Sequence, residues 1–158
     1  MSVLTTLVGG HYALTAGDKT YRVKSLIDQQ MQADFARWHF ERAVGELLAA
    51  RALYSDAEFA AEREKLRADH RAGRYDFKSA RGAELLGTPP GVAFILAQLV
   101  EGLDPAAAPE LVAQCQEDVT VLLQQIVSDS FPEAIGLAKK KALLTEPVRT
   151  ARPKPRKG

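Results

Sequence analysis

The sequence predicts a mainly α-helical fold, with a small N-terminal β-hairpin, a bundle of about four to five helices and an extended basic C-terminal tail. Three observations predict it. Alternating apolar residues flank a Gly-Asp turn near the N-terminus, long segments repeat apolar residues every three or four positions, and the last segment is basic and contains prolines. A length of 158 residues favours one domain with its own core. We therefore divide the chain into a hairpin plus helical domain over 1–138 and a basic tail over 139–158.

The hairpin prediction depends on alternation. Tyr12 and Leu14 on one side of residues 16–19, and Tyr21 and Val23 on the other, occupy every second position. The intervening Ala-Gly-Asp-Lys supplies the residue types that tight turns require. An isolated hairpin is only marginally stable, so this one is expected to pack on the helices.

A long helix is predicted over residues 26–54. Ser25 is expected to cap it, with Asp28 at the third helical position in the place of a capping-box glutamate. Phe35 and Trp38 are expected to anchor the core. The predicted buried stripe consists of Ile27, Met31, Phe35, Trp38, Val44, Leu47 and Leu48.

The next helix is predicted over residues 57–72. Ser55 and Glu58 have the spacing of a capping box, and Gly73 stands where a C-terminal cap would lie. The segment is mostly charged and has few large apolar residues. It is therefore expected to form an arm that faces solvent.

The remaining helices are predicted from apolar spacing and from the breakers between them. A short helix ends before Gly87, and a nearly apolar helix over 91–103 follows two prolines and is the expected centre of the core. A single helix is predicted over 110–130, with Cys115 on its apolar stripe as a small hydrophobe. A last short helix is predicted over 133–144.

No catalytic, cofactor or metal-binding residue is predicted. The chain has neither a GxGxxG loop nor a GxxxxGK loop followed by Ser or Thr, and no nucleophile elbow precedes any serine. His11, His39 and His70 are scattered and do not form an HExxH motif. We therefore predict a protein that is not an enzyme.

The same residues indicate a compartment. Cys115 is the single cysteine, so an internal disulfide and a multi-cysteine zinc site are excluded, which fits a reducing environment. Residues 1–10 carry no basic residue ahead of a short apolar stretch, and no window approaches roughly 18 uninterrupted apolar residues. We expect a cytoplasmic protein without membrane contact.

The charge is divided unevenly along the chain. Residues 139–158 hold 8 basic residues and 1 acidic residue, a net charge of +7, which leaves 21 − 8 = 13 basic and 20 − 1 = 19 acidic residues, or −6, in 1–138. The candidate partner-binding residues are the basic side chains of the tail: Lys139, Lys140, Lys141, Arg149, Arg152, Lys154, Arg156 and Lys157.

Several roles are open for this tail. It could neutralise nucleic-acid phosphates or dock on an acidic protein surface. It could also only aid solubility, or fold back on the acidic domain. No aromatic residue follows Phe131, which argues against stacking on single-stranded bases.

The order of the motifs resembles that of a known family. GDKTYRV (17–23) ends the hairpin, the long helix carries Phe35 and Trp38, RYDF (74–77) forms a linker, and LGTPPG (86–91) precedes a helical end. Over roughly residues 12–135 this layout resembles the tail assembly chaperones of tailed phages and prophages.

The resemblance implies a helical protein that binds tape measure or tail-tube subunits in the host cytoplasm before assembly, without catalysis or a cofactor. Two alternatives remain. One is a virion structural component of the tail or connector, and the other is an accessory protein that binds nucleic acid through the basic tail. Self-association into a homo-oligomer is also left open.

Overall fold

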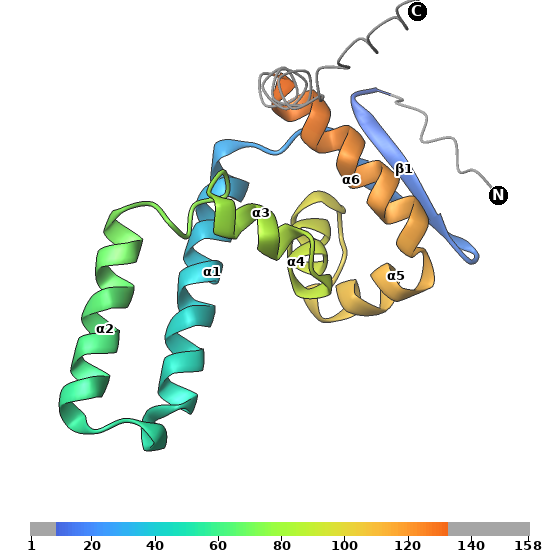
Figure 1. The fold of residues 1–158 in the computed structure, drawn as a ribbon. Coiled ribbons are helices and arrows are strands. Elements are labelled where there is room, and N and C mark those ends of the chain that lie inside the picture. The colour runs from blue at the N-terminus through green and yellow to red at the C-terminus, as the bar shows by residue number, and fades with distance from the viewer. Residues whose placement is uncertain (1–8, 133–158) are drawn as a thin grey trace, which may run out of the picture.

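The structure, a computed structural model, describes residues 9–132 and is mainly helical with one β-hairpin at its start (Figure 1). This confirms the predicted fold class. The predicted last helix over 133–144 and the basic tail over 139–158 lie outside the described residues.

The hairpin consists of β1 (His11–Ala16) and β2 (Lys19–Lys24), which pair in antiparallel fashion. The turn has two residues, and Gly17 adopts a φ of +60°, a conformation that side chains with a Cβ rarely take. Tyr12 pairs with Val23 and Leu14 pairs with Tyr21, so the alternation places Tyr12, Leu14 and Val23 in the core. The predicted hairpin is confirmed.

β2 also forms backbone contacts with the chain that follows α4. Val23 forms an isolated antiparallel bridge with Val100, and the Glu101 amide donates to the Arg22 carbonyl oxygen at 3.0 Å. The hairpin is thereby fixed to the segment that follows the central helix.

α1 (Gln29–Ala49) begins later than predicted, because Asp28 and not Ser25 is its N-cap. The Asp28 carboxylate accepts a hydrogen bond from the Met31 amide at 2.8 Å. The chain bends at Ser25 and Leu26 before it, and the Ile27 amide donates to the Ser130 hydroxyl at 2.9 Å. The predicted Ser25 cap is therefore wrong, since these residues connect α1 to the last described helix.

α2 (Asp56–Arg71) follows a short 3₁₀ turn at Arg51–Leu53. Its capping box is as predicted: the Ser55 hydroxyl accepts from the Glu58 amide at 3.2 Å, and the Glu58 carboxylate accepts from the Ser55 amide at 2.9 Å. Gly73 follows its end with a φ of +72°. No residue of α2 is buried, as expected for an arm facing solvent.

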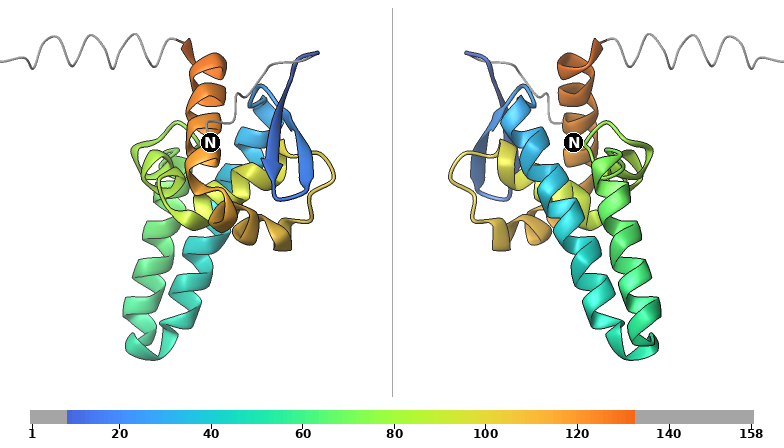
Figure 2. Two further views of the ribbon diagram at one scale, coloured as in Figure 1. Left: turned by 90° about the vertical axis from the view of Figure 1, so that its right-hand side faces the viewer. Right: turned by 90° about the vertical axis from the view of Figure 1, so that its left-hand side faces the viewer.

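The distal part of α1 and all of α2 run side by side and project away from the rest of the molecule (Figure 2). We call residues 40–71 the arm. The proximal part of α1 packs on the core.

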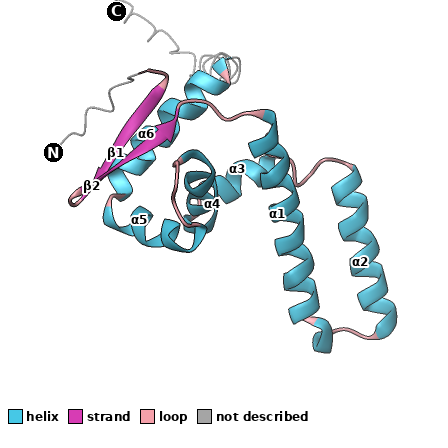
Figure 3. Ribbon diagram, turned by 180° about the vertical axis from the view of Figure 1, so that it is seen from behind, coloured by secondary structure: helices cyan, strands magenta, loops and turns pink. Residues whose placement is uncertain are grey.

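The other helices are α3 (Ala80–Leu86), α4 (Pro89–Leu99), α5 (Ala108–Gln114) and α6 (Gln116–Ser130), with a 3₁₀ turn at Pro105–Ala107 before α5 (Figure 3). α4 ends at Leu99 and not at residue 103, because Val100 is extended and bridges β2.

The predicted single helix over 110–130 is wrong, because the chain turns at Cys115 between α5 and α6. Cys115 has φ −137° and ψ 47°, and its thiol donates to the Leu111 carbonyl oxygen at 3.1 Å. The turn allows Leu111 of α5 and Leu122 of α6 to enter the same core from two directions.

The core lies between the hairpin, the proximal part of α1, α4, α5 and α6. α4 is at its centre, as predicted, with Ile95, Leu96 and Leu99 at most 1% exposed. Phe35 is fully buried, and its ring centroid is 5.3 Å from that of Phe77. Each large apolar side chain buried in this way contributes about 1.5–3 kcal/mol.

Candidate functional site

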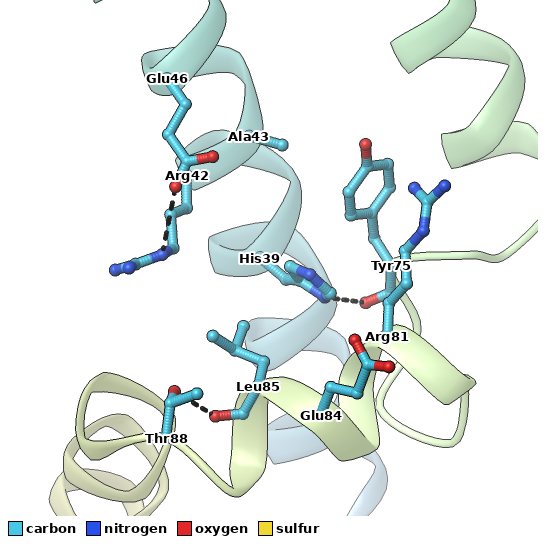
Figure 4. Close-up of a pocket in the computed structure, with 9 residues that line it drawn as sticks. All are labelled: His39, Arg42, Ala43, Glu46, Tyr75, Arg81, Glu84, Leu85 and Thr88. Carbon is cyan, nitrogen blue, oxygen red and sulfur yellow. Dashed lines mark hydrogen bonds and ion pairs between the residues drawn. The ribbon is translucent and has the colours of Figure 1, made fainter.

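A pocket of about 450 Å³ lies at the base of the arm, where α1 faces α3 and the chain that follows α2 (Figure 4). Its lining is His39, Arg42, Ala43, Glu46, Tyr75, Arg81, Glu84, Leu85 and Thr88. Two arginines and two glutamates balance, so the pocket has no strong preference for one sign of charge.

His39 is the titratable group at the centre of this pocket. Its Nδ1 lies 3.2 Å from the Tyr75 carbonyl oxygen, which can only accept, so Nδ1 carries the hydrogen. Burial lowers the pKa of His39, with the Arg81 and Arg42 charges adding to the effect and the carbonyl contact opposing it. Burial also raises the pKa of the Tyr75 phenol. Both groups are therefore neutral near pH 7.

The charged groups beside His39 hold the arm in place. The Asp69 carboxylate, in the last turns of α2, lies 3.1 Å from Arg81 Nη1 and 3.5 Å from Arg74 Nε. The Arg81 guanidinium carbon is 5.6 Å from the centre of the Tyr75 ring. These contacts join α2, the connecting chain and α3, so the direction of the arm is fixed at its base.

The pocket holds one aliphatic hydroxyl, that of Thr88. None of its nine lining residues is a serine, cysteine or lysine, and the Thr88 hydroxyl donates to the Leu85 carbonyl oxygen at 2.6 Å.

A second concave surface lies along the arm itself. α1 and α2 enclose an apolar groove of about 230 Å³, which we call the arm groove. It is lined by Phe40, Val44, Leu47, Leu48, Phe59, Arg63, Leu66 and Arg67. Leu48 is 60% exposed, and Leu53 at the tip of the arm is 83% exposed.

The geometry of the arm explains this exposure. Two helices that pack only on each other leave part of their apolar faces open. The expectation of one buried stripe along α1 is therefore only half right: Met31 and Phe35 are buried, whereas Leu48 faces solvent and Val44 and Leu47 are partly exposed.

The α2 edge of the arm groove is positively charged. Among the residues that the structure describes, Arg63 forms no ion pair. Arg67 Nη1 lies 3.9 Å from one oxygen of Glu64, whose other oxygen accepts from Arg71 at 3.0 Å. Two arginines four residues apart thus line one edge of an apolar surface.

The C-terminal part of the described chain is acidic, in contrast to the two arginines at the edge of the groove. Residues 82–132 contain no lysine, arginine or histidine. Their acidic residues are Glu84, Glu101, Asp104, Glu110, Glu117, Asp118 and Asp129. Our reasoning from the sequence compared only the tail with the rest and missed this division within the domain, although the long stretch without a basic residue was visible.

The remaining residues considered in the sequence analysis are the basic tail residues, Cys115, His11 and His70. The eight basic tail residues lie outside the described part of the chain. Burial, followed by the Asp118 charge, raises the pKa of the Cys115 thiol, in agreement with its interpretation as a small hydrophobe. His11 contacts Glu101 at 3.2 Å, and His70 stacks on Phe40 with ring centroids 4.1 Å apart.

Within residues 9–132, no group of three or more His, Cys, Asp and Glu side chains is placed to hold a metal ion. No helix of this range has the length and apolar character needed to cross a membrane.

Comparison of the chain with protein-family models, with curated proteins and with solved structures gave no match.

Proposed function

We propose that this protein is a non-enzymatic assembly protein of a phage-like tail system. In this proposal it acts in the host cytoplasm as an adaptor or chaperone for tape measure or tail-tube subunits. The partners come from the motif resemblance described above, and the mode of binding comes from the arm.

The single observation that carries the proposal is the open arm groove on a projecting, firmly based pair of helices. An apolar helix-lined surface is well suited to take up another helix, because burial of its side chains supplies the affinity and the two flanking helices supply the shape. The base contacts of Asp69 and His39 keep the groove in one orientation, which lowers the entropy cost of binding.

A second function is favoured by one observation, the net charge of +7 in residues 139–158. A nucleic-acid-binding accessory protein would lose affinity steeply with salt, because binding releases counterions from the phosphates.

The test is co-expression of the full chain, tagged, with the tape measure and tail-tube subunits of its native system. We expect the tagged chain to form a complex with one of these subunits in the lysate. We expect the tagged chain to be absent from purified particles. Stoichiometric retention in finished particles would overturn the chaperone role in favour of a structural component. Recovery of nucleic acid instead, lost in a chain ending at Ala138, would favour the accessory role.

A further inference from the structure

The arm groove has the dimensions of a short helical site. The groove runs from Phe40 to Leu48 on α1 and from Phe59 to Arg67 on α2, which is about 12 Å on each helix at the α-helical rise per residue. An occupant of about two to three helical turns would therefore cover the groove. Its apolar residues would take i, i+3, i+4 and i+7 spacing, since they must face two helices at once.

The charged edge selects among such helices. Arg63 and Arg67 lie one helical turn apart on the same edge, and no acidic residue lines the groove. A helix that carries two acidic residues four apart along one edge would place each carboxylate beside one guanidinium. A helix with basic residues there would place like charges together.

A second copy of the chain fits this surface poorly. In a two-fold symmetric pair the same patch meets itself, so the interface would hold Arg63 and Arg67 of both copies and no acidic residue of the groove lining to pair with them. The arm could instead dock on the acidic residues 82–132 of another molecule, but Leu14, Leu122 and Ile126 beneath that half are already fully buried. The exposed large apolar residues in the described part of that half are Val121 and Val127, which lie six positions apart on α6 and so do not share one helix face.

The charge of the domain supports the same choice of partner. Residues 82–132 carry seven acidic and no basic residues, so an acidic helix is repelled from that half and attracted to the α2 edge of the arm. Arg63, free of intramolecular ion pairs among the described residues, is available to meet it.

We infer that the arm groove binds an amphipathic α-helix of a partner protein, with leucine-like residues on one face and two acidic residues four apart along the edge that meets Arg63 and Arg67. This inference rests on the proposed function, whose partner-binding surface it specifies.

The test uses the full chain and two helical peptides of about 18 residues with the same leucine face. One has glutamates four apart along one edge, and the other has lysines at those positions. Fluorescence anisotropy measures binding, and the methyl NMR signals of Val44, Leu47 and Leu48 report whether the groove is the site. We expect the glutamate peptide to bind with these methyl shifts and the lysine peptide to bind at least about 5-fold more weakly.

Two variants separate the contribution of charge from the contribution of apolar burial to peptide binding. Arg63→Glu/Arg67→Glu is expected to lower the affinity for the glutamate peptide by about 5- to 30-fold and to raise the affinity for the lysine peptide. Leu48→Asp, at a position already exposed, is expected to lower the affinity for both peptides by about 10-fold or more. The control is Lys24→Glu/Lys65→Glu, which changes the net charge equally at exposed positions outside the groove and should leave binding unchanged.

Three results would overturn the inference. They are equal binding of the two peptides, binding of neither, and loss of binding in the control as large as in the arginine variant. A dimer in the absence of peptide that dissociates in Leu48→Asp would assign the groove to a second copy.

Failure of the surface and failure of the proposed function are distinguishable. If tail subunits co-purify equally with wild type and with Leu48→Asp, the assigned surface is wrong and the function stands. If the peptides behave as expected but no tail subunit is captured, the surface stands and the function is wrong.

Discussion

Substitution of Gly91 by alanine is a test in which helix propensity and packing predict opposite changes in the free energy of unfolding. It lies in the first turn of α4, where the chain crosses α3. A Cβ built on Gly91 would overlap the Leu85 carbonyl oxygen and would lie 2.6 Å from the Leu85 carbonyl carbon and 3.0 Å from Leu86 Cα. These are backbone atoms, so they cannot rotate away as a side chain would.

Helix propensity alone would make Gly91→Ala stabilising by up to about 1 kcal/mol. Overpacking against backbone typically costs about 1–3 kcal/mol, and here the two helices must move apart to accept the methyl group. Because the added Cβ meets backbone atoms, we take the upper end of that cost and expect a net loss of about 2 kcal/mol in the free energy of unfolding, and a fall in Tm of about 4–8 °C for a domain of this size.

Gly45 is the matched control, because it lies within α1 and a Cβ there would meet nothing within 4 Å. Gly45→Ala should stabilise the chain by about 0.5–1 kcal/mol through propensity. Both variants are compared with wild type by urea and thermal unfolding. If Gly91→Ala raises the free energy of unfolding as Gly45→Ala does, the close approach of α3 and α4 is refuted.

Three further outcomes follow from the contacts described above. Phe35→Ala should lower the free energy of unfolding by about 3–5 kcal/mol in urea titrations, since a fully buried ring leaves a cavity among aromatic neighbours; a loss below 1 kcal/mol would contradict this packing. Ser55→Ala should cost about 1 kcal/mol and speed amide hydrogen exchange in the first turn of α2, and unchanged exchange there would exclude the capping box. Burial holds the folded pKa of His39 below its ordinary value of about 6.5, so the unfolded chain takes up the proton first and stability falls as the pH drops below that value. His39→Gln should flatten this dependence between pH 7 and 5 in thermal unfolding; an equally steep fall in the variant would exclude His39 as its source.

The parts of the fold that could be predicted from sequence are those set by local chemistry. The Gly17 turn requires a positive φ, and alternation around it fixed which side chains of the hairpin are buried. The Ser55 capping box and the Gly73 end of α2 are likewise local and were predicted correctly.

The parts that could not be predicted depend on contacts between distant segments. Nothing near Cys115 marks a break, since neither glycine nor proline interrupts the apolar spacing, and the turn exists because α5 and α6 enter one core from different directions. Asp28 replaced Ser25 as a cap because Ile27 bonds to Ser130, more than a hundred positions away.

The candidate site was only partly visible in the sequence. The mostly charged helix was correctly interpreted as an arm, but periodicity does not tell whether a third helix covers Leu48. Partner binding by the basic residues of the tail, from Lys139 to Lys157, remains a prediction, because they lie outside the described residues.

The base of the arm also sets where the groove points. From Phe40 to Ala49 α1 extends by about 14 Å along its axis, whereas Asp69 and Arg81 meet close to the pivot. A rotation of about 10° at that pivot would displace the end of α1 by about 2 Å, roughly the radius of the backbone helix. A change in the Asp69 contacts would therefore alter where the arm reaches while leaving the chemistry of its surface intact.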